Sequence, residues 1–501
     1  MGKTTPALEK STLDKDLDKL TLNEEASHFV LKSSVGLGLG FIFLVFVMII
    51  AASAVSEAPG AIIVVAAAAI AGYMAMNIGA NDVTNNVGAA VGARAMTMTG
   101  ALVIAAIFEI AGALFAGGRV VSTIEGGLID AAAFTDSATL VWVMMSALIS
   151  AAVWINIATW CSAPISTTHA IVGSILGAGI AAVGFSSVQW LSLGGITLSW
   201  MLSPFIGGGV AAGLLFFIKT FIIYREDKIA GAVFWVPILL AVMGGVFTTY
   251  FALIGLDRVF YVSPAAGFGA GIVTGVTVYL VSRRTVARRA VGLENRNQSL
   301  RPLFHLPLVL SAALLSFAHG SNDVSNAVGP LSAIVANVDT LVPATTVNVA
   351  FWVLLIGALG ISAGLLLYGP KLIRVVGEEI TKLNPVRAFC VALATAITVI
   401  LASTFGLPVS TTHIAVGAVF GIGFFREWYT RNSRLRLEYV RRKTGQSDFL
   451  LRAEHGVDEM RRRQLVRRSH FMTIVGAWVI TVPASALLSA LLYILFSAIF
   501  L

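Results

Sequence analysis

The strongest constraint on the fold of this chain is a series of long apolar runs. A helix that crosses a bilayer needs about 20 mostly apolar residues, and lipid admits only helices or closed barrels as spanning structures. Thirteen runs reach or approach this length. The predicted membrane segments are residues 34–55, 61–93, 97–117, 138–158, 163–183, 192–218, 231–253, 262–281, 304–336, 346–369, 387–403, 407–424 and 472–500.

The composition agrees with a chain that lies mostly in lipid. Hydrophobic residues make up 57% of it and charged residues 12%, with a mean hydropathy of +0.87. Soluble domains average about 45–50% apolar and about 25% charged residues. The net charge of +8 would suggest nucleic acid in a soluble protein, but the basic residues lie between the apolar runs, so no nucleic-acid partner is expected. Cys161 and Cys390 lie in apolar runs, which argues against a disulfide framework or a zinc site.

The charges of the loops predict how the chain is oriented. With the N-terminus inside and every run crossing, only Arg119 and Arg258 among the basic residues fall outside. Because basic loops stay in the cytoplasm, we expect a multi-pass protein of the plasma membrane, or of the inner membrane in a bacterium. The large basic loops are then cytoplasmic. The segments that supply most of these charges are 219–230, 282–303, 370–386 and 425–471.

Few carboxylates interrupt the predicted spans. Only Asp82, Glu109 and Asp323 among the acidic residues lie within them. A charged side chain at the bilayer centre costs roughly 2.5–3.5 kcal/mol on insertion scales, so such residues are candidates for function. For Glu109, a functional carboxylate and a locally paired structural one remain open alternatives.

Two motifs occur twice in the same order, which indicates an internal duplication. GANDVTNN around Asp82 matches GSNDVSNA around Asp323 at an offset of 241 residues. APISTTHAIVG at 163–173 matches LPVSTTHIAVG at 407–417 at an offset of 244. On the charge map the first copy begins outside and the second inside, so the repeats are expected to be inverted. Inverted repeats with interrupted helices are typical of secondary transporters, which bind their cargo at the repeat interface.

The predicted fold is an all-α polytopic membrane protein with two inverted-topology repeats, interrupted helices, hairpins and about 12–13 membrane segments. No signal peptide is expected in the polar N-terminus. The expected organisation is a tail at 1–33, an extra span at 34–55, a first repeat at 60–222, a linker with two spans and a basic loop at 223–302, and a second repeat at 303–501 that includes the basic loop 425–471.

The first motif favours a cation site. Asn, Asp and Thr are poor residues for a helix interior because their side chains compete for backbone bonds, so the cluster predicts a broken helix. Its freed carbonyls, together with Asp82, Asn81 and Asn85, are hard oxygen donors that suit a small cation. The alternative is a polar contact between helices.

The second motif favours an anion site. Pro164 and Pro408 each stand two residues before a hydroxyl run, which predicts the start of a helix. Open N–H groups, the positive end of the helix dipole and hydroxyl donors together attract anions; simple helix capping is the alternative. His169 and His413 are packed helix residues, ligands or proton relays. His319 precedes the second cation motif and has Ile78 at the matching position.

The two motifs together predict symport. Aspartates repel an anion unless a cation lies between them, and no Lys or Arg lies deep in a predicted span. The positive charge is then expected from a cotransported cation held by Asp82 and Asp323. Charge balance leaves sodium and protons open.

GANDVTNN, HGSNDVSNAVGP and the paired PxSTTH segments resemble the inorganic phosphate transporter family over about 60–222 and 303–500. The resemblance implies a symporter that imports phosphate with a cation, and N-D-V-x-N in both copies resembles the sodium-coupled members. Thr84-Asn85-Asn86 departs from the commoner family pattern. The implied phosphate ligands are Ser166, Thr167, Thr168, Ser410, Thr411, Thr412, Asn81 and Asn322, the implied sodium ligands are Asp82, Asn85, Asp323, Asn326, Thr84 and Ser325, and further candidates are Glu109, His169 and His413.

Other functions remain as alternatives. Another oxyanion such as sulfate could be the cargo, and an ion channel could be built on the same polar cores. A membrane enzyme such as a lipid phosphatase is disfavoured because no deep Lys or Arg is present, and no ATPase phosphate loop occurs. We therefore expect no enzyme activity and no cofactor. The expected partners are phosphate, sodium or protons, and the bilayer, with a homodimer left open.

Overall fold

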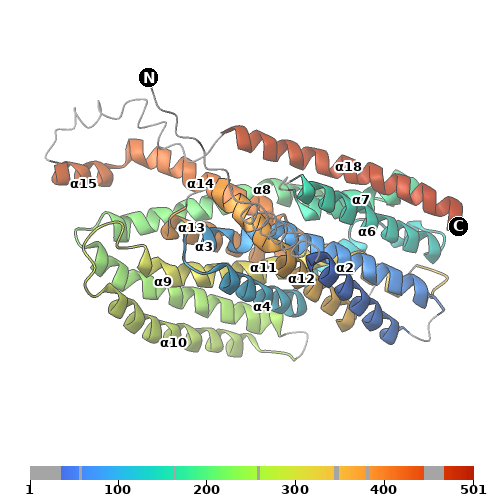
Figure 1. Ribbon diagram of the computed structural model, residues 1–501, viewed down its shortest axis with the longest axis horizontal. Helices are drawn as coiled ribbons and strands as arrows, with labels where there is room; N and C mark the ends of the chain where they lie inside the picture. Colours follow the sequence, from blue (N-terminus) through green and yellow to red (C-terminus); the bar gives the residue numbers. More distant parts are fainter. Residues whose placement is uncertain are drawn as a thin grey trace, which may run out of the picture.

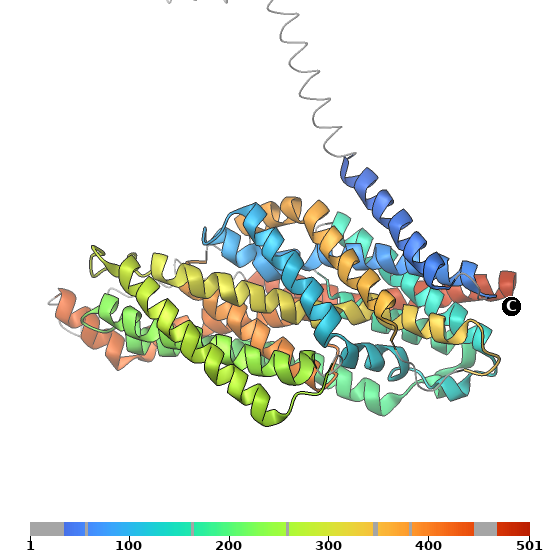
Figure 2. The ribbon, with the colours of Figure 1, turned by 90° about the horizontal axis from the view of Figure 1, so that it is seen from below.

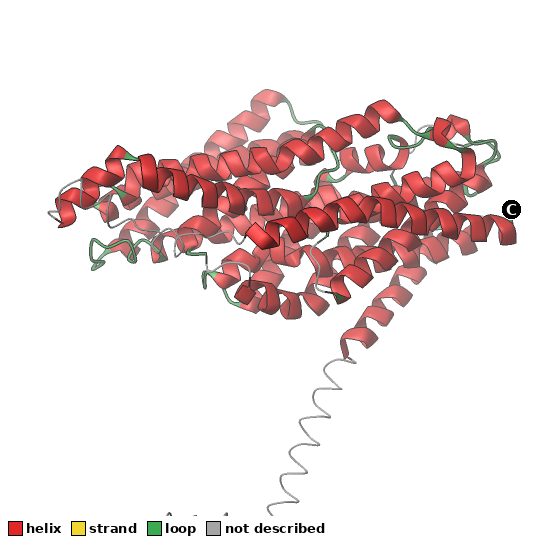
Figure 3. Ribbon diagram, turned by 90° about the horizontal axis from the view of Figure 1, so that it is seen from above, coloured by secondary structure: helices red, strands yellow, loops and turns green. Residues whose placement is uncertain are grey.

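The computed structural model describes residues 35–55, 59–161, 165–256, 260–343, 349–379, 383–444 and 468–501. In these ranges the chain is helical and contains no strand (Figure 3). The predicted N-terminal tail and much of the basic loop 425–471 lie outside them. Each of the thirteen predicted runs corresponds to a helix.

The helices follow one another along the chain in a simple order. They are the N-terminal helix Val35–Ala54, α2 Ala61–Val83, α3 Ala89–Gly92, α4 Met98–Ala116, α5 Gly118–Gly126, α6 Ser137–Trp160, α7 Thr167–Val183, α8 Trp190–Ile218, α9 Lys228–Tyr250, α10 Pro264–Ala290, α11 His305–Asn337, α12 Phe351–Glu379, α13 Pro385–Thr404, α14 Thr411–Asn432, α15 Arg434–Thr444 and α18 Arg468–Phe500.

The predicted class is confirmed: this is an all-α, multi-pass membrane protein. Eleven helices in the described part of the chain are long and apolar enough to cross a bilayer. Two further predicted segments are the helices α7, which is shorter, and α14, which ends in charged residues. Helices α5 and α15 were not predicted, because a search for 20-residue apolar runs misses a short or a strongly basic helix.

The expected break in the helix occurs at one motif and not at the other. In the first copy, α2 passes into a π-helical segment at Thr84–Gly88 and then into α3. In the second copy, α11 runs unbroken from His305 to Asn337, with Pro330 inside it. The prediction of an interrupted second helix is therefore wrong. Side chains that bond along their own helix, such as the Ser325 hydroxyl donating to the Asn322 carbonyl at 2.6 Å, satisfy the polar cluster without unwinding it.

Two groups of helices lie at the edges of the bundle. Helices α9 and α10 pack against each other at one edge (Figure 1), and α10 exposes Phe268, Ile272 and Val273, as expected for a helix in contact with lipid. The N-terminal helix leans against one end of the bundle (Figure 2), where Val47 packs over Gly72 of α2. The polar motifs lie away from these edges, in the middle of the bundle.

The remaining helices pair in a reciprocal pattern. Helix α2 packs against α12 while α11 packs against α4, and α7 packs against α18 while α14 packs against α8. Each of these helices of the first half thus packs against a helix of the second half. Helices at equivalent positions in the two halves form equivalent pairs. This exchange is the pattern expected of two halves related by a two-fold axis.

Glycines allow these pairs to approach to backbone contact. A Cβ on Gly79 of α2 would lie 1.9 Å from the carbonyl oxygen of Ile361, and one on Gly320 of α11 would lie 2.2 Å from that of Glu109. Gly79 and Gly320 are the same motif position in the two copies, so the crossings are equivalent. Small residues permit this close packing of membrane helices. Further equivalent contacts are Gly112 on Phe317, Gly364 on Met76, Gly177 on Ala486 and Gly421 on Gly208.

Substitution at these crossings should destabilise the bundle. We expect Gly79→Ala and Gly320→Ala each to lower the apparent melting temperature in detergent by several degrees, because overpacking typically costs about 1–3 kcal/mol and here the clash is with backbone. Gly92→Ala is the matched control, since nothing lies within 4 Å of its added Cβ. Equal melting temperatures for all three variants would contradict this account of the crossings.

Candidate functional site

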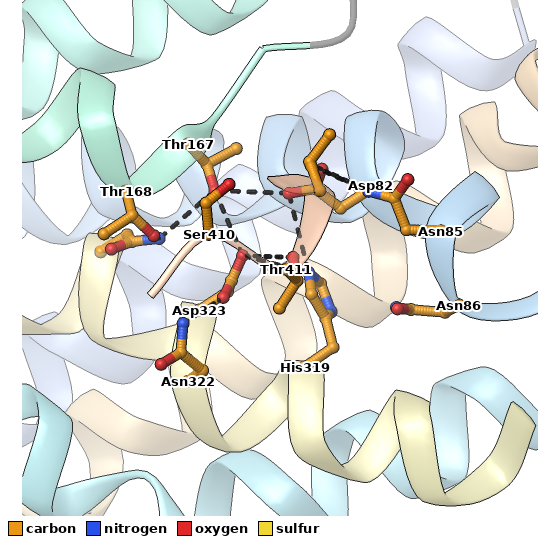
Figure 4. A network of polar contacts seen from close by, with 12 residues as sticks. Asp82, Asn85, Asn86, Thr167, Thr168, His319, Asn322, Asp323, Ser410 and Thr411 are labelled. Atoms are coloured by element: carbon orange, nitrogen blue, oxygen red, sulfur yellow. Dashed lines mark hydrogen bonds and ion pairs between the residues drawn. The ribbon is translucent and has the colours of Figure 1, made fainter. Parts of the chain in front are cut away.

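The two duplicated motifs meet in the middle of the bundle. The first motif lies at the end of α2 and in the π-helical segment that follows it, and in the middle of α11; the N-termini of α7 and α14 carry the second. Figure 4 shows the side chains from all four helices gathered into one polar network. The sequence motifs, far apart along the chain, therefore form a single candidate site at the contact between the two halves.

Asp82 and Asp323 face each other within this network. Each has 1% of its surface exposed. The Thr167 hydroxyl lies 3.3 Å from Oδ2 of Asp82 and 3.2 Å from Oδ2 of Asp323, so one hydroxyl reaches both carboxylates (Figure 4). Two carboxylates this close repel each other unless a positive charge lies between them.

His319 is the basic group nearest to these carboxylates. Its Nε2 lies 3.3 Å from Oδ2 of Asp323 and 3.7 Å from Oδ2 of Asp82. The ligand atoms of these three side chains all lie within 4.8 Å of one another, close enough to hold one cation. When protonated, His319 could itself supply the positive charge that charge balance in the sequence assigned to a cotransported cation.

Glu109 holds His319 from the other side. Its Oε1 lies 3.1 Å from Nδ1 of His319 and accepts a 2.6 Å hydrogen bond from Nδ2 of Asn86. The sequence is compatible with a functional or a structural role for Glu109, and in the structure this residue directly contacts the ring beside both aspartates. Oε2 of Glu109 and Oδ1 of Asn86 are buried without a partner in the described part of the chain.

His319 was not among the site residues predicted from the sequence. The available signal was its spacing of four residues from Asp323, which places both on one face of a helix. The lack of a repeat counterpart weighed against it. The structure shows that the pair is asymmetric: Ile78 stands where the first repeat would have the histidine, and Ile361 stands where the second would have Glu109.

The predicted helix starts at the second motif are confirmed. Helices α7 and α14 begin at Thr167 and Thr411, each immediately after a serine. Oγ of Ser166 accepts the His169 N–H at 3.2 Å, and Oγ of Ser410 accepts the His413 N–H at 3.3 Å. Each hydroxyl keeps its own proton for donation to a ligand, while the positive ends of both helix dipoles point into the site.

Contacts between the halves assemble the site. Nδ2 of Asn85, on the π-helical segment after α2, donates to the Thr412 hydroxyl at 2.9 Å, and that hydroxyl donates to Oδ1 of Asp82 at 3.0 Å. In the equivalent contact, Nδ2 of Asn326 donates to the Thr168 hydroxyl at 3.2 Å. The Thr167 hydroxyl also crosses between the halves, since it lies 3.2 Å from Oδ2 of Asp323. Neither half can form this network without the other.

The asparagines that precede the aspartates bond to other parts of the chain, and their role as phosphate ligands stays a prediction. Nδ2 of Asn81 donates to the Thr159 hydroxyl at 3.0 Å, at the end of α6. Nδ2 of Asn322 donates to the carbonyl of Val409 at 2.7 Å. Asn81 therefore bonds to α6, whereas Asn322 bonds to the residues directly before α14.

Two predicted sodium ligands lie at the margin of the network. The Ser325 hydroxyl is buried and donates to the carbonyl of Asn322 in its own helix. Thr84 is half-buried in the π-helical segment, and no hydrogen bond joins it to the other site residues in the described part of the chain. Their sodium-binding role stays a prediction.

The rings of His169 and His413 pack against each other, tilted by 39°, at the contact between the halves. Their ring centroids lie 4.5 Å apart, with Trp200 3.8 Å from His169 and Trp478 3.6 Å from His413. The indole N–H of Trp200 donates to the carbonyl of Pro408 at 2.8 Å. Among the alternatives left by the sequence, this column of four rings favours a packing role for both histidines.

Comparison with known proteins agrees with this geometry. The family model described as "Phosphate transporter family" matches residues 78–489, a stretch that contains both copies of both motifs. The chain belongs to the phosphate transporter family. This is a family of transporters and not of enzymes, in agreement with the prediction from sequence.

Relatives of this family member cover nearly its whole length. A protein of Helicobacter pylori (strain J99), named as a candidate phosphate permease, is 40% identical over 515 aligned residues, which span 94% of this chain and 97% of the relative. A protein of Chlamydia trachomatis with the same name is 35% identical over 85% of this chain and 97% of its own. A solved structure titled "The sodium-dependent phosphate transporter" is similar with a TM-score of 0.75 and 32% identity, covering 87% of this chain and 100% of that one.

The ring column leads to a test of the two histidines. We expect His413→Phe to keep the melting temperature within a few degrees of the unmodified protein, because an aromatic ring still fills the gap between His169 and Trp478. His413→Ala should lower it clearly, since replacing a buried aromatic ring by Ala typically costs about 3–5 kcal/mol. Thermal unfolding in detergent measures both. A Phe variant as unstable as the Ala variant would show that the imidazole nitrogens matter and would contradict a packing role.

Proposed function

We propose that this protein is a symporter that moves inorganic phosphate together with sodium ions. The observation that supports it most is the joint site: two buried carboxylates face two helix N-termini that carry hydroxyl groups, all inside a membrane bundle. Carboxylates suit a cation and helix N-termini suit an anion. Membership of the phosphate transporter family supports phosphate as the anion.

The anion is proposed to bind at the N-termini of α7 and α14. Thr168 donates to the carbonyl of Val409 at 3.1 Å, which brings the two helix starts together. The hydroxyl groups of Ser166 and Ser410 accept backbone N–H bonds and retain protons to donate. Phosphate offers oxygens on several sides, so two helix starts that face one space can share it.

Sodium is proposed to bind between the aspartates and the threonines of the STT runs. The Thr167 hydroxyl lies within 3.3 Å of a carboxylate oxygen of both Asp82 and Asp323. These hard oxygen atoms are the donor type that sodium and similar hard cations prefer. A cation there offsets the repulsion between the carboxylates and between them and the anion. Sodium is favoured over protons because the neighbour of known structure is titled as sodium-dependent.

The two halves are proposed to be inverted repeats, at about 60–222 and 303–501, joined by the linker 223–302. The reciprocal pairs of helices and the equivalent glycine crossings support the two-fold relation. The distribution of basic residues supports opposite orientations in the membrane. Such a pair of halves can expose one central site to either side in turn.

The anion is tested by uptake of radiolabelled phosphate into proteoliposomes, with sodium and proton gradients imposed separately. We expect saturable uptake driven by sodium, with arsenate as a competitor because it has the shape and charge of phosphate, and without competition by sulfate. Efficient competition by sulfate would remove the phosphate assignment. Flux that does not saturate would favour a channel.

The cation is tested by Asp82→Asn and Asp323→Asn, which keep the side-chain shape and remove one negative charge. We expect sodium-driven uptake to fall by about tenfold or more in each, since a cation in a membrane site depends on its carboxylates. The dependence of the remaining rate on sodium should also weaken. Glu125→Gln is the matched control, because Glu125 is another buried carboxylate and lies on α5, outside the site.

The outcomes of this experiment separate the two parts of the proposal. Uptake by the unmodified protein that is indifferent to sodium and follows an imposed pH gradient would exclude sodium and leave symport standing. Asp variants with unchanged flux and unchanged cation dependence would exclude both.

The orientation is tested by labelling introduced cysteines in intact cells, in a background with the exposed Cys161 replaced by Ser. We expect Glu438→Cys on α15 to react only from the cytoplasm and Leu341→Cys, which lies between α11 and α12, to react from outside. The basic helix α15 should remain on the side that the positive-inside rule assigns to it. The opposite pattern would overturn the proposed topology and the inverted repeats with it.

A further inference from the structure

The nitrogen and the oxygen of the Asn322 side-chain amide both form hydrogen bonds with the segment that leads into α14. Its Nδ2 donates to the carbonyl of Val409 at 2.7 Å, and its Oδ1 lies 3.4 Å from the N–H of the same residue. Oδ1 also lies 3.4 Å from the donating Ser403 hydroxyl, at the end of α13. The second amide proton of Nδ2 points to Oδ1 of Asp323 at 2.7 Å. The amide therefore clasps the backbone N–H and C=O of Val409, directly before Ser410.

These bonds occupy the side-chain polar atoms that Asn322 would need in order to bind phosphate directly. Both amide protons of Asn322 are engaged, and its oxygen accepts from two donors. The side chain is 0% exposed. Asn322 therefore acts on the anion site through Val409 and Ser410, by fixing where α14 begins.

The matching position in the first repeat has only part of this arrangement. Nδ2 of Asn81 donates to the hydroxyl of Thr159, which is the counterpart of Ser403. Ile165 is the counterpart of Val409, and no hydrogen bond joins it to Asn81 in the described part of the chain. The clasp is thus closed in the second repeat and open in the first.

The second copy of the motif is also more deeply buried than the first. Asn322, Ser325 and Asn326 in the second copy are 0% exposed. Their counterparts in the first copy, Asn81, Thr84 and Asn85, are all partly exposed. Because the two copies of the motif have nearly the same sequence, each can adopt the arrangement of the other. The difference in hydrogen bonds and burial therefore describes two states available to one motif.

We propose that Asn81 and Asn322 are positioning residues that alternate in clasping the segment before the STT helix, one repeat closed while the other is open. This inference rests on the proposed transport function and explains how one site could face each side in turn. In the opposite state, Asn81 clasps the peptide unit of Ile165 and Asn322 releases that of Val409. Phosphate coordination stays with the STT hydroxyls and helix N-termini.

The test reads the exposure of each copy separately. Single cysteines are introduced as Thr84→Cys and Ser325→Cys in a Cys161→Ser background, and the rate of reaction with a small polar thiol reagent is measured on purified protein in lipid nanodiscs. With both asparagines intact, Thr84→Cys should react readily and Ser325→Cys should be protected, following the burial of the two positions.

Asn322→Ala should then move the two rates in opposite directions. We expect labelling of Ser325→Cys to rise about tenfold or more and labelling of Thr84→Cys to fall, because the loss of two bonds to Val409 disfavours this state by about fivefold for each bond. Asn81→Ala is the matched variant. It should leave Ser325→Cys protected and Thr84→Cys reactive, since the clasp it removes belongs to the opposite state.

Purely structural damage predicts a different result. It would raise labelling at both cysteines in either variant, and that outcome would overturn the proposal, as would unchanged rates in Asn322→Ala. Should Asn322→Ala fail to fold, Asn322→Asp keeps the shape and the acceptor of the Val409 N–H, loses the donor to its carbonyl, and should shift both rates with the same signs.

The labelling assay needs neither phosphate nor sodium, so its result stands apart from the identity of the cargo. Opposite shifts in the two rates would support the clasp even if uptake showed another anion or protons. Uptake of phosphate with sodium, combined with parallel shifts, would leave the proposed function intact and remove the clasp.

Discussion

The structure depends on two carboxylates buried opposite each other in the membrane. Asp82 and Asp323 lie within hydrogen-bonding distance of one hydroxyl, that of Thr167, and both face the ring of His319. Placing two negative charges so close in a medium of low dielectric constant is costly unless a cation or a proton accompanies them. The surrounding Asn and Thr side chains donate hydrogen bonds to these carboxylates and to one another.

The packing of the helices makes this arrangement attainable. At Gly79 and Gly320 the helix backbones touch those of α12 and α4, which brings α2 and α11 into the centre of the bundle. The starts of α7 and α14 are held over them by a column of four aromatic rings and by bonds from Asn85 and Asn326. Because every pair joins one half to the other, a movement of either half must alter the site.

Much of the fold and of the site followed from local patterns. All thirteen runs are helices, since lipid forces an apolar segment of that length to satisfy its own backbone. The starts at Thr167 and Thr411 followed from the proline and hydroxyl pattern, a short-range capping effect. The contact of Glu109 with His319 could not be predicted in this way, because the two residues are 210 positions apart and neither has a counterpart in the other repeat. The continuity of α11 was also missed, because propensity is a weak guide where side chains bond along their own helix.

The sequence by itself determined which residue types would be buried in the membrane and in what repeated order. Insertion into lipid carries a free-energy cost for every polar group that lacks a partner. The sequence therefore identified Asp82, Asp323 and the STT runs as members of a site. The tertiary structure alone decided their partners: which threonine lies against which aspartate, that His319 stands between both, and that Asn322 clasps Val409 while Asn81 leaves Ile165 unclasped. These contacts join segments distant along the chain, and their geometry depends on how two nearly equivalent halves pack, which no local pattern encodes.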